Sequence, residues 1–376
     1  MFKNLQKSME EVAKFSNHKG YWYKIQDVMI TMISGLLSGL ETVEDIFEWS
    51  REKHVFNFLQ KTFGIKKLPK KSHFYNMLTY VNYKKFNEKF EQWILESLQG
   101  NLEDEVITID GKSIVSSVNF SHDKSMLHIA SAMIAKSGMI IASRECEKHK
   151  FSEINVLREI VKELNVKGAL IVADALHTQV ETASTIIDAG ADYLLVVKDN
   201  QSNLKESIDL LSYNKKTDEA STIEKNGGRI ETRMAFLSDN IENLYNKEKW
   251  KNAVCIGAIH REFEKDGKKS SQWHYYISSK KMTAKDLLHY ARQEWRIESM
   301  HWLLDVHFKE DKTKIRDLEV QKNLNLLRKI TINLVKQYQA SQPKHIPVSR
   351  ILKRNMYNIE NLLDFVTHFR KNGELE

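Results

Sequence analysis

Two short apolar stretches that each end in aspartate decide the fold: Val106-Ile107-Thr108-Ile109-Asp110 and Leu170-Ile171-Val172-Ala173-Asp174. Aliphatic and β-branched residues in runs of this length are typical of strands buried inside a sheet. Aspartate is depleted in strands, and a buried carboxylate is costly unless a cation or hydrogen bonds compensate its charge. Asp110 and Asp174 are therefore either turn residues that follow their strands or functional groups at the carboxyl edge of a sheet, where ligands gather in α/β proteins.

The sequence around these stretches predicts a mixed α/β sheet. Three strands are expected before a βαβ-type alternation of strands and helices, which is the pattern of a mixed sheet flanked by helices. The further strands are expected over 126–135, 139–143 and 193–198, and the helices over 154–164, 178–189, 283–307 and 323–338.

The flanking regions differ in character. The N-terminal part has helical periodicity and no good strand, whereas a polar, turn-rich segment interrupts the α/β part. Two hairpin signals, Asn226-Gly227-Gly228 and Asp266-Gly267, predict that this segment is an insertion of strands and loops. The expected divisions are an all-α N-terminal domain over 1–100, an α/β domain over 101–320 with a β-rich insertion over about 199–272, and a C-terminal helical segment over 321–376.

Composition limits the class of protein. The 376 residues include 57 Lys and Arg against 50 Asp and Glu, a net charge of +7, and 41% are hydrophobic, as in ordinary globular proteins. The positive excess suits a polyanionic partner without establishing one. Two cysteines exclude a disulfide-stapled secreted scaffold. We expect a cytoplasmic protein, because we find neither a membrane span nor a secretory signal.

A third acidic signal lies in the helix expected over 283–307. Glu294, Glu298 and Asp305 fall on one helical face, where like charges one turn apart repel each other. A cation bound at this face would explain the stripe. The alternative is a solvated face that is neutralised by nearby basic residues, namely Arg292, Arg296 and His301.

Together these acids match a divalent-metal site. Asp110, Asp174 and Glu298 supply the oxygen donors that Mg²⁺ prefers. Two such ions about 4 Å apart can hold both the attacking and the leaving oxygen of an in-line phosphoryl transfer.

The chain resembles the H-repeat-associated transposases, a group of bacterial insertion-sequence DDE transposases. The resemblance covers about residues 20 to 340, in the right order. It is carried by Ile109-Asp110-Gly111-Lys112, Ala173-Asp174-Ala175-Leu176-His177, 192–201, Tyr275-Tyr276-Ile277-Ser278-Ser279, Trp295-Arg296-Ile297-Glu298, His301-Trp302-Leu303-Leu304-Asp305-Val306, Phe308, Glu310, Asp311, Asn323, Leu324, Leu327 and Arg328.

This resemblance implies an RNase H-like catalytic core in which Asp110, Asp174 and Glu298 form the metal-binding triad. It implies Mg²⁺, or Mn²⁺ as a substitute, and double-stranded DNA as element ends and target. A homodimer or higher oligomer is expected, because two ends must be joined. The expected activity is cleavage of element ends and transfer of the 3′-hydroxyl to target DNA. The alternatives are a metal-dependent nuclease of the same fold, a catalytically retired relative that only binds DNA, and an α/β protein whose acids are merely surface residues.

Six other residues are candidates for supporting roles. Lys112, Lys198, Arg229 and Arg233 could contact DNA phosphates, with solvated surface side chains as the alternative. His177 could position a water or phosphate, or pack within its loop. Asp305 could orient a metal-bound water from the second coordination shell. The family usually has His-Gly-Arg in the insertion, where this chain has Gly227-Gly228-Arg229.

Overall fold

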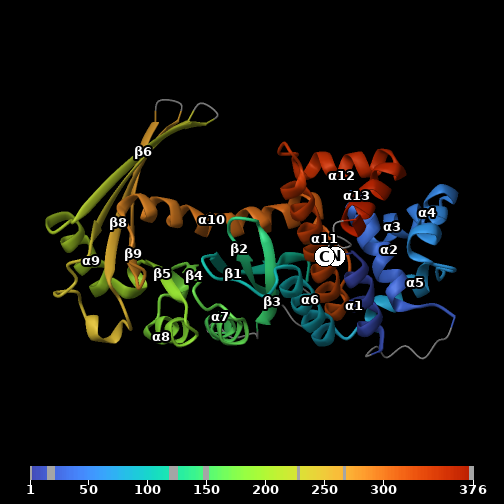
Figure 1. Ribbon diagram of the computed structural model, residues 1–376, viewed down its shortest axis with the longest axis horizontal. Helices are drawn as coiled ribbons and strands as arrows, with labels where there is room; N and C mark the ends of the chain where they lie inside the picture. The colour runs from blue at the N-terminus through green and yellow to red at the C-terminus, as the bar shows by residue number, and fades with distance from the viewer. Residues whose placement is uncertain are drawn as a thin grey trace.

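The molecule is elongated, with a helical lobe at one end, a β arm at the other and the central sheet between them (Figure 1). The β arm consists of the four strands over 218–226, 229–238, 255–265 and 268–278. Among the helices in the described part of the chain, none combines the length and the apolar character that a membrane span requires. The structure is a computed structural model that describes residues 2–14, 22–117, 126–146, 152–226, 229–265 and 268–371.

The described N-terminal residues are helical, as the sequence predicts. Helix α2 is buried on nearly all sides, because it packs against α1, α3, α5 and the distant α11 (Leu318–Ser341). The side chain of Thr42 caps α3 by accepting a hydrogen bond from the Asp45 amide at 3.0 Å. The helices are α1 (Phe2–Lys14), α2 (Ile25–Leu37), α3 (Val43–Trp49), α4 (Lys53–Phe63), α5 (Lys71–Thr79) and α6 (Tyr83–Ser97).

Five strands form the central sheet in the order β3-β2-β1-β4-β5. β1 is antiparallel to β2 and parallel to β4, while β3 is antiparallel to β2 and β5 is parallel to β4. This arrangement confirms the expected RNase H-like core. The strands are β1 (Val106–Ile114), β2 (Leu127–Ile134), β3 (Met139–Cys146), β4 (Leu170–Ala173) and β5 (Asp192–Val197).

The insertion continues this sheet. β5 pairs with β9 and the order runs on through β8, β7 and β6, so the sheet has nine strands. The turns of the two expected hairpins lie outside the described residues, but the strands on either side of each are paired. The added strands are β6 (Asp218–Asn226), β7 (Arg229–Ser238), β8 (Cys255–Lys265) and β9 (Lys268–Ser278).

One element of the insertion was not expected. The prediction of strands and loops alone is wrong for α9 (Ser202–Asn214), which is a helix. Leu204 and Ile208 lie one turn apart on it and are buried, and α9 contacts β7, β8 and β9. Packing against the sheet thus stabilises a helix in a stretch too polar to show a clear periodicity.

Helices cover the two faces of the sheet. α7 (Ser152–Glu163) and α8 (Val180–Asp188) lie on one face, and α10 (Ala284–His307) crosses the other, as Figure 1 shows. A capping box between Thr283 and Asp286 begins α10. The remaining elements are α11 (Leu318–Ser341), α12 (Val348–Tyr357), α13 (Ile359–Lys371) and the short helices η1 (Val115–Ser117), η2 (Ala175–His177), η3 (Asp199–Gln201), η4 (Lys247–Lys249) and η5 (Glu310–Lys312).

Candidate active site

Strand pairing places Asp110 and Asp174 side by side. Ile109 of β1 lies opposite Ala173 of β4 in the parallel ladder, so the next residue of each strand is an aspartate. Side chains alternate between the two faces of a sheet, and the even-numbered Leu170 and Val172 pack on the α10 side. Asp110 and Asp174 continue this alternation, so both belong to the face that α10 crosses.

The prediction that both aspartates lie at the ends of their strands is wrong for Asp110. Asp110 does not end its strand, because β1 runs on to Ile114 while β2 continues to pair with it. Asp174 does follow the end of β4, and its Oδ1 accepts a hydrogen bond from the Leu176 amide at 2.9 Å. Only Asp174 therefore has the strand-end position that we expected for both.

Asp110 lies in a negatively charged environment. Burial raises its pKa to about 6, with further contributions from the charges of Glu153 and Asp174. His301 of α10 lies beside it, with Nδ1 3.6 Å from Asp110 Oδ2. Burial and the two neighbouring carboxylates thus disfavour the ionised form of Asp110.

α10 brings further carboxylates to the same place. Burial raises the pKa of Glu294 to about 7, and the charges of Asp174, Glu298 and Asp110 raise it further while Lys198 opposes them. Glu298 itself is exposed. Glu294 shares the acidic face predicted for this helix but is not among the predicted metal ligands, and it lies close to both aspartates.

Glu153 is a further acid near Asp110, and nothing in the sequence around it predicts this position. Burial opposes its ionisation, but hydrogen bonds from His128 and His177 lower its pKa to about 2. His128 Nε2 lies 2.6 Å from Glu153 Oε2 and His177 Nε2 lies 3.1 Å from Oε1. Gly111 packs so tightly here that a Cβ on it would lie 2.4 Å from His128 and 2.5 Å from Glu153. His177 thus lies near the acids, as predicted, and is held by Glu153.

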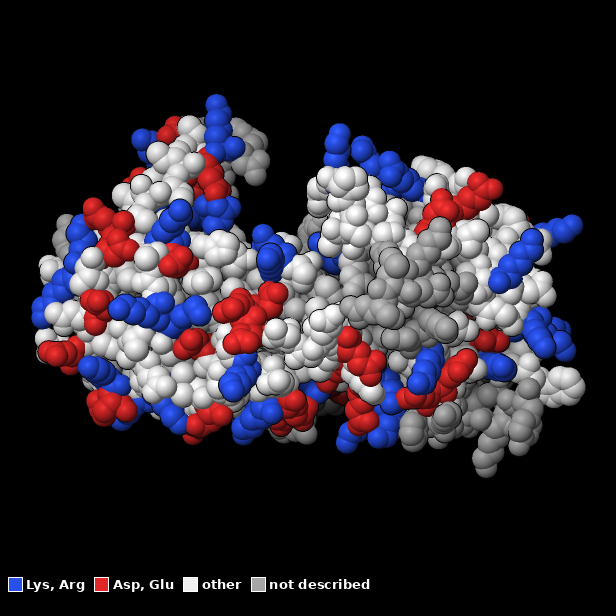
Figure 2. All heavy atoms as spheres, viewed as in Figure 1, with Lys and Arg blue, Asp and Glu red and all other residues white. Residues whose placement is uncertain are grey.

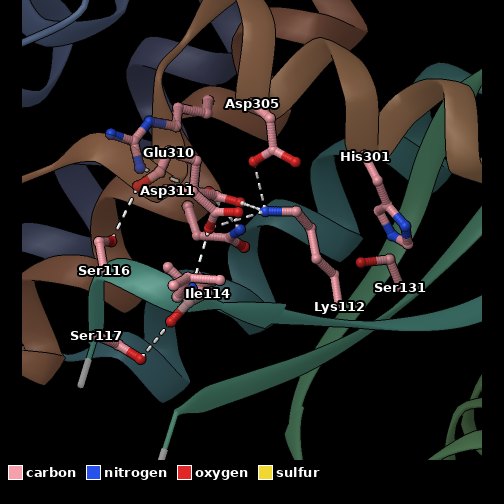
Figure 3. A network of polar contacts seen from close by, with 12 residues as sticks. Lys112, Ile114, Ser116, Ser117, Ser131, His301, Asp305, Glu310 and Asp311 are labelled. Carbon is pink, nitrogen blue, oxygen red and sulfur yellow. Dashed lines mark hydrogen bonds and ion pairs between the residues drawn. The ribbon is translucent and has the colours of Figure 1, made fainter.

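Lys112 lies in an internal ion-pair network (Figure 3). Its Nζ is 2.7 Å from Asp305, 3.1 Å from Glu310 and 3.4 Å from Asp311, and its side chain is only 12% exposed. The side chains that we expected to contact a phosphate and to orient a metal-bound water therefore contact each other.

Glu310 is the centre of this network. Its side chain is fully buried, and burial alone would raise its pKa, yet the charges of Arg328 and Lys112 lower it. Asn325 donates a hydrogen bond to Glu310 Oε1 at 2.9 Å. The network joins β1, η5 and α11 just beyond Asp110.

The other predicted DNA contacts lie in different surroundings. Lys198 is exposed at the end of β5, and its charge acts on Glu294, so it lies beside the acids. Arg233 is mostly buried and pairs with Glu231 and Glu224. Arg229 begins β7, and its side chain lies outside the described residues.

The donor set fits a hard divalent cation. Burial first, and neighbouring carboxylates second, raise the pKa values of Asp110 and Glu294, and a divalent cation bound here would favour their ionised forms. Within the described ranges, however, no three or more His, Cys, Asp or Glu side chains are spaced as a ready-made metal site. Binding would thus require the side chains to rearrange around the ion.

Comparisons with known proteins agree on a family. A family profile described as "Transposase DDE domain" matches residues 102–334. The chain is 30% identical to "Putative transposase YncI" of Escherichia coli O157:H7 over 84% of this chain and 82% of that protein. It is 29% identical to "H repeat-associated putative transposase YhhI" of Escherichia coli K12 over 88% and 90%.

A solved structure is also similar at a greater distance. The piggyBac transposase synaptic complex with hairpin DNA has a TM-score of 0.45 and 12% identity, over 99% of this chain and 79% of that one. This likeness is too distant to support an inference about the site.

Replacing Asp110 by Asn should stabilise the metal-free protein at high pH. Because the folded-state pKa of Asp110 is raised, folded protein binds this proton more tightly than unfolded protein, and the free energy of unfolding falls as the pH rises from about 4 through 6. Urea unfolding in EDTA should show Asp110→Asn to be more stable than wild type by about 1–3 kcal/mol at pH 8 and equal to it near pH 4. Asp364→Asn, at an exposed site, is the control. Equal stability of Asp110→Asn and wild type at both pH values would contradict this electrostatic picture.

Replacing Lys112 by Met should destabilise the protein strongly. The change leaves the fully buried Glu310 with less compensating charge, and removal of one partner of a buried pair costs about 3–5 kcal/mol. Lys251→Met breaks an exposed pair with Asp188 and should cost less than about 1 kcal/mol in the same urea titration. Similar small losses for both variants would show that the network contributes little.

Proposed function

The chain belongs to the transposase DDE domain family, and on that premise we propose that it cuts DNA at the ends of a mobile element and joins the freed 3′-hydroxyl to target DNA. The observation that carries the proposal is the pairing of β1 with β4, which sets Asp110 beside Asp174 on the face that α10 crosses. Carboxylates at this position suit metal-assisted phosphoryl transfer.

In this proposal Asp110, Asp174 and Glu298 hold two Mg²⁺ ions, which Mn²⁺ can replace. The bound ions would polarise the scissile phosphate and lower the pKa of the attacking water or hydroxyl. The role of the protein is then to position the reacting groups and to balance their charge. Glu298 is exposed, so it is free to turn toward the aspartates when metal and DNA bind.

Other residues support the site in this proposal. Lys198 stands beside the acids and would neutralise a phosphate of the bound strand. Glu153 holds His177 and packs against Gly111, and thereby fixes the backbone next to Asp110. Lys112 and Asp305 would support the site indirectly, through the ion-pair network around Glu310. Arg229 and Arg233 would bind DNA from the β arm.

The partner is double-stranded DNA, both as element end and as target. Two element ends must be joined to one target, so we propose that a homodimer or higher oligomer assembles on the DNA. The net charge of +7 favours association with this polyanion.

A nuclease of the same fold would use the same acids without strand transfer. The two activities separate in an assay with an element end that is already cut and carries a free 3′-hydroxyl. A transposase joins this end to a target plasmid in the presence of Mg²⁺ or Mn²⁺, whereas a nuclease only shortens it. A relative that only binds DNA would do neither.

Neutralising the proposed triad should abolish cleavage but spare DNA binding. Asp110→Asn, Asp174→Asn and Glu298→Gln should each lower the single-turnover cleavage rate by about a thousandfold or more, because about 4 kcal/mol of metal-dependent stabilisation of the transition state is lost. DNA affinity, measured by fluorescence anisotropy without metal, should not fall.

Glu294→Gln is the matched comparison, because Glu294 lies one helical turn from Glu298 and feels the charges of both aspartates. It should lower the cleavage rate by less than about tenfold, since it removes charge without removing a proposed ligand. If Glu294→Gln loses cleavage while Glu298→Gln keeps it, Glu294 and not Glu298 is the third metal ligand. Full activity of Asp174→Asn would refute the metal-site assignment itself.

A further inference from the structure

The face of α10 opposite Glu298 is basic. Arg296 lies about 160° around the helix from Glu298, at about 100° per residue. Two cavities lie along this face, of about 470 and 530 Å³, and both are lined by Arg296 and Ser299. They adjoin at these residues and together form one trough, to which no Asp or Glu contributes a lining side chain among the described residues.

We call this surface the basic trough and define it by six residues. It lies between the β arm, α10, the β2–β3 turn and α11. Its residues are Arg233, Arg261, Arg292, Arg296, Lys136 and Lys336.

The end at the β arm has more positive than negative charge. Glu231 pairs with Arg233 and Arg261, and Glu224 pairs with Arg233 and Arg292, so three arginines face two glutamates. The Arg261 guanidinium also lies 4.5 Å from the centre of the Trp295 ring, which is 44% exposed. An accessible ring beside arginines can stack on a nucleotide base as well as on a guanidinium.

The end of the trough at the β2–β3 turn is also positively charged, and its basic side chains have no acidic partners among the described residues. Arg296 donates hydrogen bonds to the carbonyl oxygens of Ala135 at 2.8 Å and Lys136 at 3.2 Å, which holds it at the β2–β3 turn. Lys336 is half-buried, and burial together with the charge of Arg296 lowers its pKa. Within the described ranges, no ion pair involves Lys136, Arg296 or Lys336. Gathered positive charges of this kind are unfavourable unless an anion binds them.

The shape of the molecule suits an extended anion. It is hollowed between the β arm and the α12–α13 lobe, and Lys and Arg side chains stand on both walls (Figure 2). α10 crosses the floor of this hollow (Figure 1). The trough follows α10 from Leu288 to Leu303, a length of about 22 Å, which matches about six base pairs of duplex.

We propose that the basic trough binds the sugar–phosphate backbone of a DNA segment distinct from the phosphate that is cut. This inference rests on the proposed function for the identity of the polyanion. The β-arm end of the trough borders the acids, because Tyr276 lines it and lies near both Glu294 and the arginines. The other end lies away from Asp110, because Ile134, just before the β2–β3 turn, pairs with Ile107 near the start of β1. DNA bound at that end therefore flanks the reacting phosphate. The contacts are made to backbone charge, so they carry little sequence specificity.

Lys136→Gln with Lys336→Gln is the test variant. Neither residue belongs to the proposed catalytic machinery, and neither has an ion pair to lose among the described residues. Lys247→Gln with Lys249→Gln in η4 removes the same charge from exposed positions outside the trough and is the matched control. Thermal melts verify that each variant is folded.

The measurement is binding of a 30-base-pair duplex by fluorescence anisotropy in EDTA, as a function of salt concentration. Each phosphate contact contributes about 0.9 to the slope of log K against log salt, so the trough variant should lose up to about 1.8 in slope and bind about tenfold or more weaker at 0.1 M salt. The control should keep the wild-type slope. An unchanged slope in the trough variant, or an equal loss in the control, would overturn the proposal.

Cleavage distinguishes the two proposals. At saturating protein, the trough variant should cleave with a single-turnover rate within about twofold of wild type, because its defect is in binding. A wild type that binds through the trough but never cleaves would overturn the proposed function alone. A wild type that cleaves, with a trough variant that binds normally, would overturn the trough alone.

Discussion

The register of β1 against β4 is the constraint on which the site depends. A parallel ladder that places Ile109 opposite Ala173 necessarily brings Asp110 and Asp174 together, on the face where α10 adds Glu294 and Glu298. Carboxylates held this close repel each other, and burial makes their ionised forms still less favourable. The fold thus holds carboxylates together where their ionised forms are unfavourable, and a divalent cation bound between them would stabilise those forms.

The surroundings of the aspartates are built to hold this arrangement. On the α7 face of β1, Glu153 joins His128 and His177 and packs against Gly111, the residue after Asp110. Beyond Asp110, Lys112 and the buried Glu310 tie β1 to the segment after α10. Both sets of contacts fix the backbone around Asp110, so the acids do not relieve their repulsion by moving the strand.

Local patterns in the sequence predicted the core well. The βαβ alternation gave the mixed sheet, and the helix expected over 283–307 is α10, from Ala284 to His307. Features that depend on contacts distant in sequence were missed. Glu153 looks like an ordinary acid in the first turn of a helix, and the partners of Lys112 lie almost 200 residues away. Nothing local indicated that the insertion would continue the central sheet, because strand pairing across β5 and β9 is a tertiary event.

The most direct test of the account is the position of a bound metal. A crystal of the protein with Mn²⁺ and an element-end duplex should give anomalous difference density between Asp110 and Asp174, at carboxylate coordination distances of about 2.0–2.4 Å, with Glu298 turned toward it. Density at other residues only, with the two aspartates unligated in the DNA-bound complex, would contradict the account.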